Sequence, residues 1–212
     1  MTVFDITTEL TGAPVPSDEP ETRLTRLLSI ADGDRCNLTK LEMSLHSGTH
    51  LEAPFHYLNN GLTLSEMNLS SFLGDCTVVA CNGLANDLTG ADIEKLVRPG
   101  TKKVLFKTLG GCRLSRSAAF ALIQAGVQLV GIDSPSIAPD DDEETVHREL
   151  MMAGVALLEG LTLREGVTYY LVMKYIDNTE YNDVFLSGRT DIIVGMARNN
   201  DKSEDNNVTI QS

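Results

Sequence analysis

The segment Leu41-Glu-Met-Ser-Leu-His-Ser-Gly-Thr-His-Leu-Glu-Ala-Pro-Phe-His-Tyr57 holds three of the four histidines of this chain. In an extended strand, residues two apart point to the same face. The even positions carry the polar candidates His46, His50, Glu52 and His56, whereas the odd positions are largely apolar. A helix fits less well, because Gly48 and Pro54 disfavour a helix interior. We therefore expect a strand that becomes an irregular loop at about Gly48 and presents three imidazoles and a carboxylate to one cavity, as a metal site would.

Outward from this segment, apolar and polar patterns predict alternating strands and helices. Runs rich in β-branched and apolar residues predict strands at 4–7, 38–47, 76–81, 103–108, 127–133 and 192–196. Capping residues and apolar spacing predict helices at 64–69, 89–97 and 116–125. This alternation predicts an α/β domain.

Two acidic stretches of the chain are interpreted without a metal. The run Asp140-Asp-Asp-Glu-Glu144 is read as the first turn of a helix that continues to about Ala153, because the helix dipole favours acids there. The proline- and acid-containing stretch 12–20 is read as a loop.

Length and composition restrict the class of protein. With 212 residues, 42% hydrophobic and 22% charged, the chain is expected to form one soluble domain over residues 1–198, followed by a disordered polar tail at 199–212. The formal net charge of −13 argues against nucleic acid or an anionic membrane as a partner. No apolar run approaches the roughly 20 residues that span a bilayer, and no secretion signal is recognised, so a cytoplasmic protein is expected.

The four cysteines do not provide a metal site. Their positions, Cys36, Cys76, Cys81 and Cys112, form no Cys-x-x-Cys pair and lie away from the histidine run. Buried, reduced thiols are the expected state.

The histidine run resembles a known family signature. His46-Ser-Gly-Thr-His-Leu-Glu-Ala-Pro-Phe-His56 is similar to the His-x-Gly-Thr-His-x-Asp-x-Pro-x-His motif of the metal-dependent cyclase-like hydrolases, the family of bacterial kynurenine formamidases and isatin hydrolases. Gly131-Ile-Asp-Ser-Pro-Ser136, His147 and Glu159 extend the resemblance, which covers roughly residues 3–171. Beyond Tyr170 the resemblance fades.

The resemblance implies roles for the polar residues. It implies that His46, His50 and Glu52 hold one metal ion, and that Glu52, His147 and Glu159 hold a second, with Glu52 bridging the two. The implied ions are Zn²⁺, two per chain, with Mn²⁺ as an alternative. His56 would be the general acid and base. Asp133 and Ser134 would orient ligands, while Gly48 and Thr49 shape the loop.

One position departs from the family motif, because Glu52 stands where the family has Asp. The extra methylene extends the carboxylate by about 1.5 Å, whereas metal–ligand distances vary by only about 0.2 Å. Either the loop must shift or the coordination must change.

The resemblance also implies a fold, an assembly and an activity. The fold is a single α/β domain with barrel-like β structure and flanking helices, assembled as a homodimer or homotetramer. The activity is hydrolysis of the C–N bond of a small arylformamide such as N-formylkynurenine. An isatin-type cyclic amide, a lactone, or a cyclase or dehydratase substrate is the alternative within this fold. Phe55, Tyr57 and Phe72 are candidates for an aromatic pocket in a chain that has no Trp.

Two non-enzymatic readings remain open on the sequence. The first is a metal- or ligand-binding relative in which Glu52 has disabled the bridge between the metal ions. The second is a closed structural zinc site, which is disfavoured because such sites usually use several cysteines.

Overall fold

A computed structural model of the protein describes residues 2–15, 19–81, 84, 86–163, 169–174, 192–197 and 209–211. Within these residues, nine strands form one sheet in the order β11-β1-β10-β9-β5-β6-β7-β8-β4. Four consecutive strands of this sheet run parallel to one another: β5 (Gly74–Ala80), β6 (Lys103–Lys107), β7 (Leu129–Ile132) and β8 (Ala156–Glu159). Within the described residues, β11 and β4 are the two edges of this sheet.

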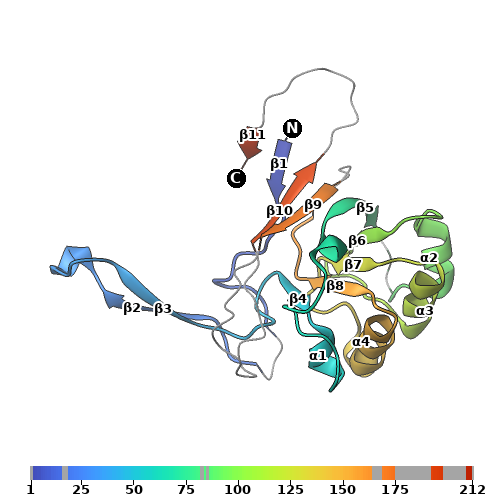
Figure 1. The fold of residues 1–212 in the computed structure, drawn as a ribbon, viewed down its shortest axis with the longest axis horizontal. Helices are drawn as coiled ribbons and strands as arrows, with labels where there is room; N and C mark the ends of the chain where they lie inside the picture. Colours follow the sequence, from blue (N-terminus) through green and yellow to red (C-terminus); the bar gives the residue numbers. More distant parts are fainter. Residues whose placement is uncertain are drawn as a thin grey trace.

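Three helices connect the parallel strands and lie side by side along them (Figure 1). They are α2 (Gly90–Leu96), α3 (Arg116–Gln124) and α4 (Glu143–Met152). Thr89 caps α2 and Ser115 caps α3, each accepting a backbone N–H of the first turn. The expected α/β architecture is confirmed, and so are the caps that the sequence predicts.

Alternate residues of the parallel strands face two different hydrophobic clusters. Val104, Phe106 and Val130 pack with α2, α3 and α4. Leu105 and Leu129 point to the opposite face, where the chain packs segments from its first half. These segments contribute Ile6, Leu51, Leu64 and Phe72. Because both faces are covered, the strands are buried and form a rigid base for the loops at their carboxyl ends.

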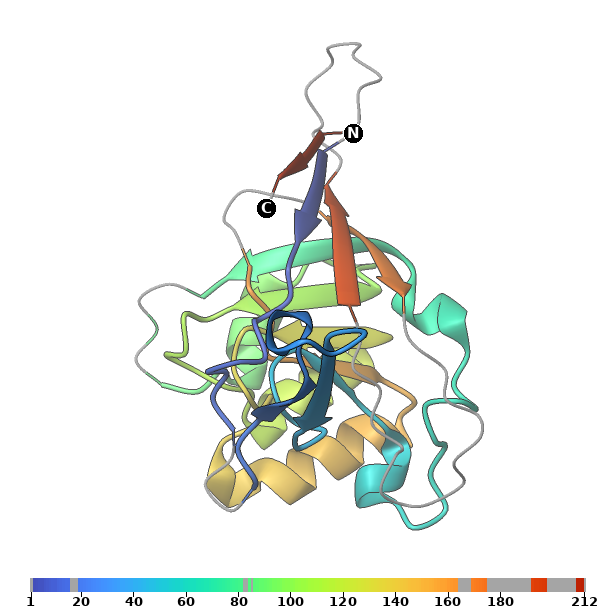
Figure 2. The same cartoon turned by 90° about the vertical axis from the view of Figure 1, so that its left-hand side faces the viewer.

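The remaining strands of the sheet come from both ends of the chain. They are β1 (Thr2–Asp5), β9 (Tyr169–Lys174), β10 (Ile192–Ala197) and β11 (Thr209–Gln211). β1 pairs antiparallel with β10 and parallel with β11, so that segments far apart in sequence lie side by side (Figure 2). Residues 192–196 do form a strand, but β11 follows it. Apart from β11, the expected tail at 199–212 lies outside the described residues.

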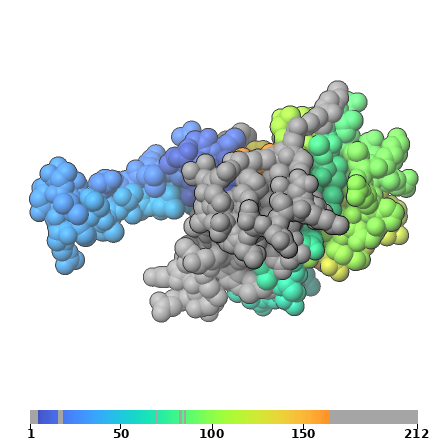
Figure 3. All heavy atoms as spheres, turned by 90° about the horizontal axis from the view of Figure 1, so that it is seen from above, coloured from blue at the N-terminus to red at the C-terminus, as the bar shows by residue number. Residues whose placement is uncertain are grey.

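A two-stranded arm projects from the body of the molecule (Figures 1 and 3). Its strands are β2 (Arg23–Leu28) and β3 (Leu38–Glu42), joined through the short 3-10 helix η1 (Ile30–Asp32). The strand predicted at 38–47 therefore ends early, because the chain turns back toward the sheet after Glu42.

The histidine segment is more regular after Gly48 than the sequence analysis expected. The strand β4 (His50–Glu52) pairs antiparallel with β8, and the one-turn helix α1 (Pro54–Tyr57) follows with proline at its first position. The expectation of an irregular loop is wrong here, since pairing with β8 supplies the backbone hydrogen bonds that make residues 50–52 a strand. Proline suits this first helical position because a backbone N–H there would have no acceptor within the helix, so its absence costs no hydrogen bond.

One predicted helix is absent and another is confirmed. Residues 64–69 form turns followed by the 3-10 helix η2 (Leu69–Phe72), because Glu66 accepts the backbone N–H of Thr63 and closes a tight turn. The acidic run begins with the 3-10 helix η3 (Asp140–Asp142) and continues as α4, as predicted. Among the described residues, no helix has both the length and the apolar character to cross a bilayer.

Candidate metal centre and its pocket

The polar candidates of the sequence converge at one edge of the sheet. In the β4–β8 pair, His50 lies directly opposite Glu159, and Glu52 lies two residues farther on the same face. The buried helix residue His147 approaches the Glu159 carboxylate. His46 reaches the carboxylate of Glu52 from the turn before β4. The structure therefore brings together all five residues that the resemblance implied as metal ligands.

Each of the three imidazoles is held through its Nδ1 atom. His50 Nδ1 lies 3.1 Å from the carbonyl oxygen of Gly48, and His147 Nδ1 lies 2.7 Å from that of Glu143. His46 Nδ1 lies 2.5 Å from Oε1 of Glu19. Carbonyl and carboxylate oxygens only accept hydrogen bonds, so Nδ1 carries the proton in each ring. In the neutral ring, Nε2 then has a free lone pair.

These three Nε2 atoms all face carboxylates. Glu52 Oε1 lies 3.3 Å from Nε2 of His46 and 3.2 Å from Nε2 of His50. Glu159 uses both oxygens, with Oε2 at 3.2 Å from His50 Nε2 and Oε1 at 3.1 Å from His147 Nε2. The lone pairs of a neutral ring and of a carboxylate repel at these distances, and either a proton on Nε2 or a metal ion between the two atoms would relieve that repulsion.

Two buried polar atoms support a cation at this position. His50 Nε2 and Glu52 Oε2 are buried and make no hydrogen bond with any described residue. An unsatisfied buried polar atom costs about 1–3 kcal/mol, whereas a metal ion would satisfy both atoms at once. Imidazole nitrogen with carboxylate oxygen is a donor set that suits Zn²⁺ and related divalent ions. The residues present therefore fit a metal ion.

The electrostatics of the cluster also favour positive charge. Burial alone would raise the pKa of the Glu159 carboxyl, but His147 and His50 hold that pKa well below its usual range. Burial alone would lower the pKa of His50, yet Glu159 and Glu52 raise it to about 10. Burial alone would likewise lower the pKa of His147, but its contact with Glu159 raises that pKa. A buried site that stabilises imidazolium in this way also stabilises a bound cation.

A pocket of about 800 Å³ opens above this cluster. His56 lines it, with its ring centroid 4.6 Å from that of His46. Partial burial lowers the pKa of His56, so its ring is neutral near pH 7. Tyr57 also lines the pocket and stacks on His147 at 4.7 Å between ring centroids. Volumes of roughly 300–1,000 Å³ are typical of small-molecule sites.

Two of the three aromatic candidates of the sequence are not in this pocket. Tyr57 lines it, but Phe72 is 3% exposed and packs in the hydrophobic core against the sheet. Phe55 is not among the pocket residues either. Phe55 and Tyr57 are two residues apart in the one-turn helix α1, where residues at this spacing point in different directions.

Sequence reasoning missed the acidic pocket residue whose side chain contacts His46. Glu19 lies in the stretch that was read as a plain loop, yet it contacts Nδ1 of His46 and accepts a hydrogen bond from the Ser44 hydroxyl. Partial burial alone would raise the pKa of Glu19, but these contacts lower it. No sequence periodicity marks Glu19, because only the tertiary fold brings its loop to the histidines.

The expected ligand-orienting roles of Asp133 and Ser134 are corrected by the hydrogen bonds. The Asp133 carboxylate accepts the backbone N–H groups of Thr108 at 2.8 Å and Leu109 at 3.0 Å, so it fixes that loop rather than an imidazole. Ser134 acts through its backbone, where its carbonyl oxygen accepts the N–H of Gly160 at 2.8 Å. This contact fixes the residue that follows Glu159.

The two glycine-containing turns of the site lie against each other. Thr49 Oγ1 donates to the Gly160 carbonyl at 2.5 Å and accepts the Thr8 N–H at 2.8 Å. Gly48 has a φ of 67°, which favours glycine. Gly48 and Thr49 thus shape the loop, as the sequence analysis expected.

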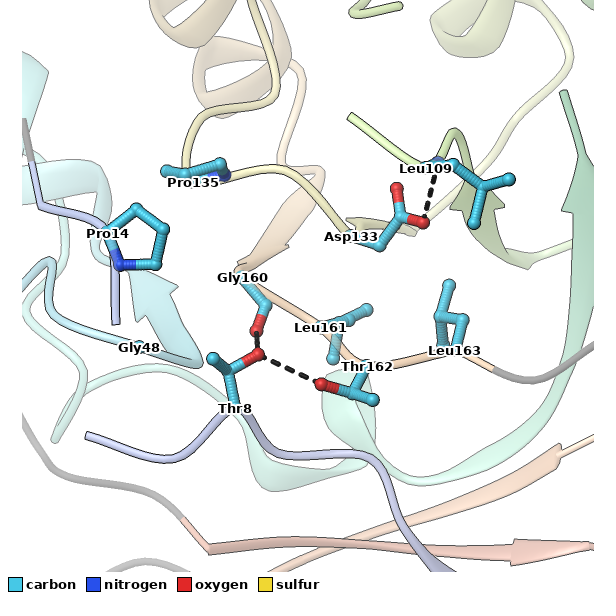
Figure 4. A pocket seen from close by; sticks show the side chains of 10 residues that line it. All are labelled: Thr8, Pro14, Gly48, Leu109, Asp133, Pro135, Gly160, Leu161, Thr162 and Leu163. Carbon is cyan, nitrogen blue, oxygen red and sulfur yellow. Dashed lines mark hydrogen bonds between the residues drawn. The ribbon is translucent and has the colours of Figure 1, made fainter. Parts of the chain in front are cut away.

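A second, smaller pocket of about 350 Å³ lies beside these turns (Figure 4). Pro14, Leu109, Pro135, Leu161 and Leu163 form its apolar lining. The hydroxyl of Thr8 bonds the Gly160 carbonyl and the Thr162 hydroxyl, so the polar groups drawn there satisfy one another. It therefore offers no cluster of free polar groups for chemistry.

The fold and the convergent histidines and carboxylates define a class of protein, and comparison with known sequences agrees. The model of the Cyclase family matches residues 4–139, and the chain belongs to this family. More specifically, it is a cyclase-family hydrolase.

Individual relatives and structures are similar to this chain. The kynurenine formamidase of Erythrobacter litoralis (strain HTCC2594) is 29% identical over 173 residues, which are 76% of this chain and 79% of that protein. A structure described as a potential metal-dependent hydrolase with cyclase activity has a TM-score of 0.75 at 25% identity, over 93% of this chain and 98% of the other. Isatin hydrolase A from Labrenzia aggregata shares the fold, with a TM-score of 0.71 at 18% identity over 92% and 94% of the two chains.

Proposed function

We propose that this protein is a metal-dependent amidohydrolase that cleaves the C–N bond of a small arylformamide such as N-formylkynurenine. The observation that carries the proposal is the set of three imidazoles whose Nε2 atoms face two buried carboxylates beneath a pocket. The kynurenine formamidase relative supports a formamide as the substrate class.

The chain supplies ligands for two divalent ions, with Zn²⁺ or Mn²⁺ as the candidates. His46, His50 and Glu52 would hold one ion, and His147 and Glu159 would hold the other with Glu52 between them. Bound there, a divalent ion lowers the pKa of a water molecule and polarises a carbonyl group. The buried β4–β8 pair positions His50, Glu52 and Glu159 among these side chains.

His56 is the proposed proton carrier of the reaction. Because partial burial lowers its pKa, the neutral ring can take a proton from the attacking water near pH 7. The same ring then gives that proton to the departing amine as the C–N bond breaks, which leaves formate and a free arylamine. Positioned acid–base groups of this kind contribute about 10²- to 10⁴-fold to a rate.

Arg113 and Tyr57 suit the two ends of an aromatic amino-acid substrate. Arg113 lines the pocket, and its Nη1 donates to Asp140 at 2.6 Å and to the Ala138 carbonyl at 3.3 Å. No described residue holds its other N–H groups, which can therefore bind a substrate carboxylate. The Tyr57 ring, which lines the same pocket, offers a face to an aryl group.

Turnover and metal content together test this function. We expect purified protein to contain about two divalent ions per chain and to release formate from N-formylkynurenine. Isatin is assayed in parallel because isatin hydrolase A shares the fold. With metal present, absence of turnover of both compounds would overturn the proposed hydrolysis of these amides.

The His56→Gln variant separates catalysis from binding. It should keep its metal, because His56 is not among the five proposed ligands, and kcat should fall about 10²- to 10⁴-fold. Unchanged turnover would remove His56 from its catalytic role. A protein that binds metal and shows no hydrolysis in any form would instead be the non-catalytic relative.

We also propose that copies of the chain associate through the arm. Its exposed apolar side chains are Leu24, Leu27, Ile30, Leu38 and Leu41. Leu24 and Leu41 are 53% and 43% exposed and face each other across β2 and β3. Exposed apolar surface of this kind marks interaction sites.

Light scattering after size-exclusion chromatography tests this association. The double variant Leu24→Asp/Leu41→Asp should shift a dimer or tetramer to monomer. Phe120→Asp, at a 60% exposed position on α3, is the matched control and should not. A wild-type monomer would overturn the proposed assembly.

A further inference from the structure

His46 differs from the other two imidazoles in what holds its Nδ1 atom. For His50 and His147 the acceptor is a backbone carbonyl oxygen, which no substitution removes. For His46 the acceptor is the Glu19 side chain, with Oε1 at 2.5 Å. This imidazole therefore depends on a residue that can be changed without altering any proposed ligand.

Ser44 completes the contact from the opposite side. Its hydroxyl donates to Oε2 of Glu19, and its Oγ accepts the backbone N–H of His46 at 3.1 Å. Both oxygens of the Glu19 carboxylate are thus engaged, which fixes the plane of the carboxylate and the ring that it holds.

Glu19 and Ser44 stand on either side of the arm in sequence. Glu19 precedes the first residue of β2, Arg23, by four positions, and Ser44 follows the last residue of β3, Glu42, by two. The hydrogen bond between them therefore closes the base of the arm and joins both of its legs to His46.

We propose that Glu19 is a positioning residue that orients His46 toward Glu52 and sets the affinity of the metal ion which these two residues share. This inference rests on the proposed metal-dependent function. A charged acceptor on Nδ1–H fixes the tautomer that leaves Nε2 free and makes Nε2 a stronger ligand. It also holds the ring against rotation away from Glu52, whose Oε1 lies 3.3 Å from Nε2.

Metal titration of the full-length chain tests this role without any assay of activity. Zn²⁺ is titrated into metal-free wild type, Glu19→Gln, Glu19→Ala and Ser44→Ala in competition with a chelator. Loss of such an acceptor costs about 10- to 100-fold in metal affinity. We expect Glu19→Ala to show that loss, with Glu19→Gln and Ser44→Ala weakened less.

The pattern across the two ions separates positioning from general loosening. Only the ion held by His46 should bind more weakly, while the ion held by His147 and Glu159 should keep its wild-type affinity. If wild type binds only one ion, the affinity for that ion should fall in Glu19→Ala. Glu9→Gln is the matched control, because Glu9 is exposed in the same N-terminal segment and contacts Thr11 instead of a histidine.

The possible outcomes decide the inference and the proposed function separately. Wild-type affinity in Glu19→Ala, or equal weakening of both ions, overturns the role of Glu19 and leaves the proposed function intact. Metal binding with the expected losses but no hydrolysis overturns the function and supports Glu19. A wild type that binds no divalent ion overturns both.

Discussion

Gly160 lies so close to Gly48 that a Cβ on Gly160 would overlap the carbonyl oxygen of Gly48. Gly160 also has a φ of 65°, so its backbone conformation is itself one that favours glycine. It follows Glu159 directly, while Gly48 lies between His46 and His50. This close approach brings the ligand candidates of the two turns together.

The substitution Gly160→Ala should strongly destabilise the protein. A left-handed backbone costs roughly 1–2 kcal/mol for a residue with a Cβ, and the overlap adds about 1–3 kcal/mol. Gly154→Ala is the matched control, because Gly154 has a φ of 75° and open space around its Cβ position. The free energy of unfolding, measured by urea denaturation, should fall by about 1–2 kcal/mol in Gly154→Ala. It should fall by clearly more in Gly160→Ala. Equal losses would contradict the close approach.

Shortening Glu52 should weaken metal binding although the family motif has Asp at this position. The Glu52 side chain already reaches Nε2 of His46 and His50 at 3.3 and 3.2 Å. Glu52→Asp withdraws the carboxylate by about 1.5 Å, which exceeds the roughly 0.2 Å tolerance of ligand distances. We expect affinity for Zn²⁺ to fall about tenfold or more in chelator competition. Tighter binding by Glu52→Asp would show that the segment adapts to the shorter residue.

Arg113 should select for substrates that carry a carboxylate. In Arg113→Met, KM for N-formylkynurenine should rise about 10- to 100-fold, since a hydrogen bond to a charged group is worth about 1.5–3 kcal/mol. KM for N-formylaniline, which lacks the carboxylate, should not change. Arg116→Met is the control, because Arg116 is exposed and pairs with Glu149 at 2.7 Å outside the pocket. A parallel rise for both substrates would mean that Arg113 supports the fold of the pocket instead.

The cysteines should differ sharply in alkylation. Burial raises the pKa of Cys81 to about 12 and also raises that of Cys112, and the thiolate is the reactive form. At pH 8 iodoacetamide should modify the partly exposed Cys36 and leave these two thiols intact, as mass spectrometry of peptides would show. The rate at which iodoacetamide alkylates Cys81 should rise as the pH approaches 12. All four cysteines should react in denaturant, and modification of Cys81 as fast as Cys36 in folded protein would contradict this prediction.

Local sequence predicted much of the helical layer and the parallel strands. Thr89 and Ser115 predicted the starts of α2 and α3, and the acidic run predicted the start of α4. These signals are local, because capping side chains and the helix dipole act within the first turn of a helix. The histidine segment was less predictable. A strand ending in an irregular loop at about Gly48 was expected for His46, His50 and His56, but the structure places them in a turn, a strand and a helical turn.

By itself, the sequence determined the set of chemical groups: the histidine run, its resemblance to a family motif, and the distant His147 and Glu159 that complete that resemblance. Only the tertiary structure decided how those groups meet, since the pairing of β4 with β8 places His50 opposite Glu159. It also revealed Glu19, whose contact with His46 spans 27 positions. Local patterns extend over one or two turns or a strand, whereas contacts of this range depend on how the whole sheet and its loops pack.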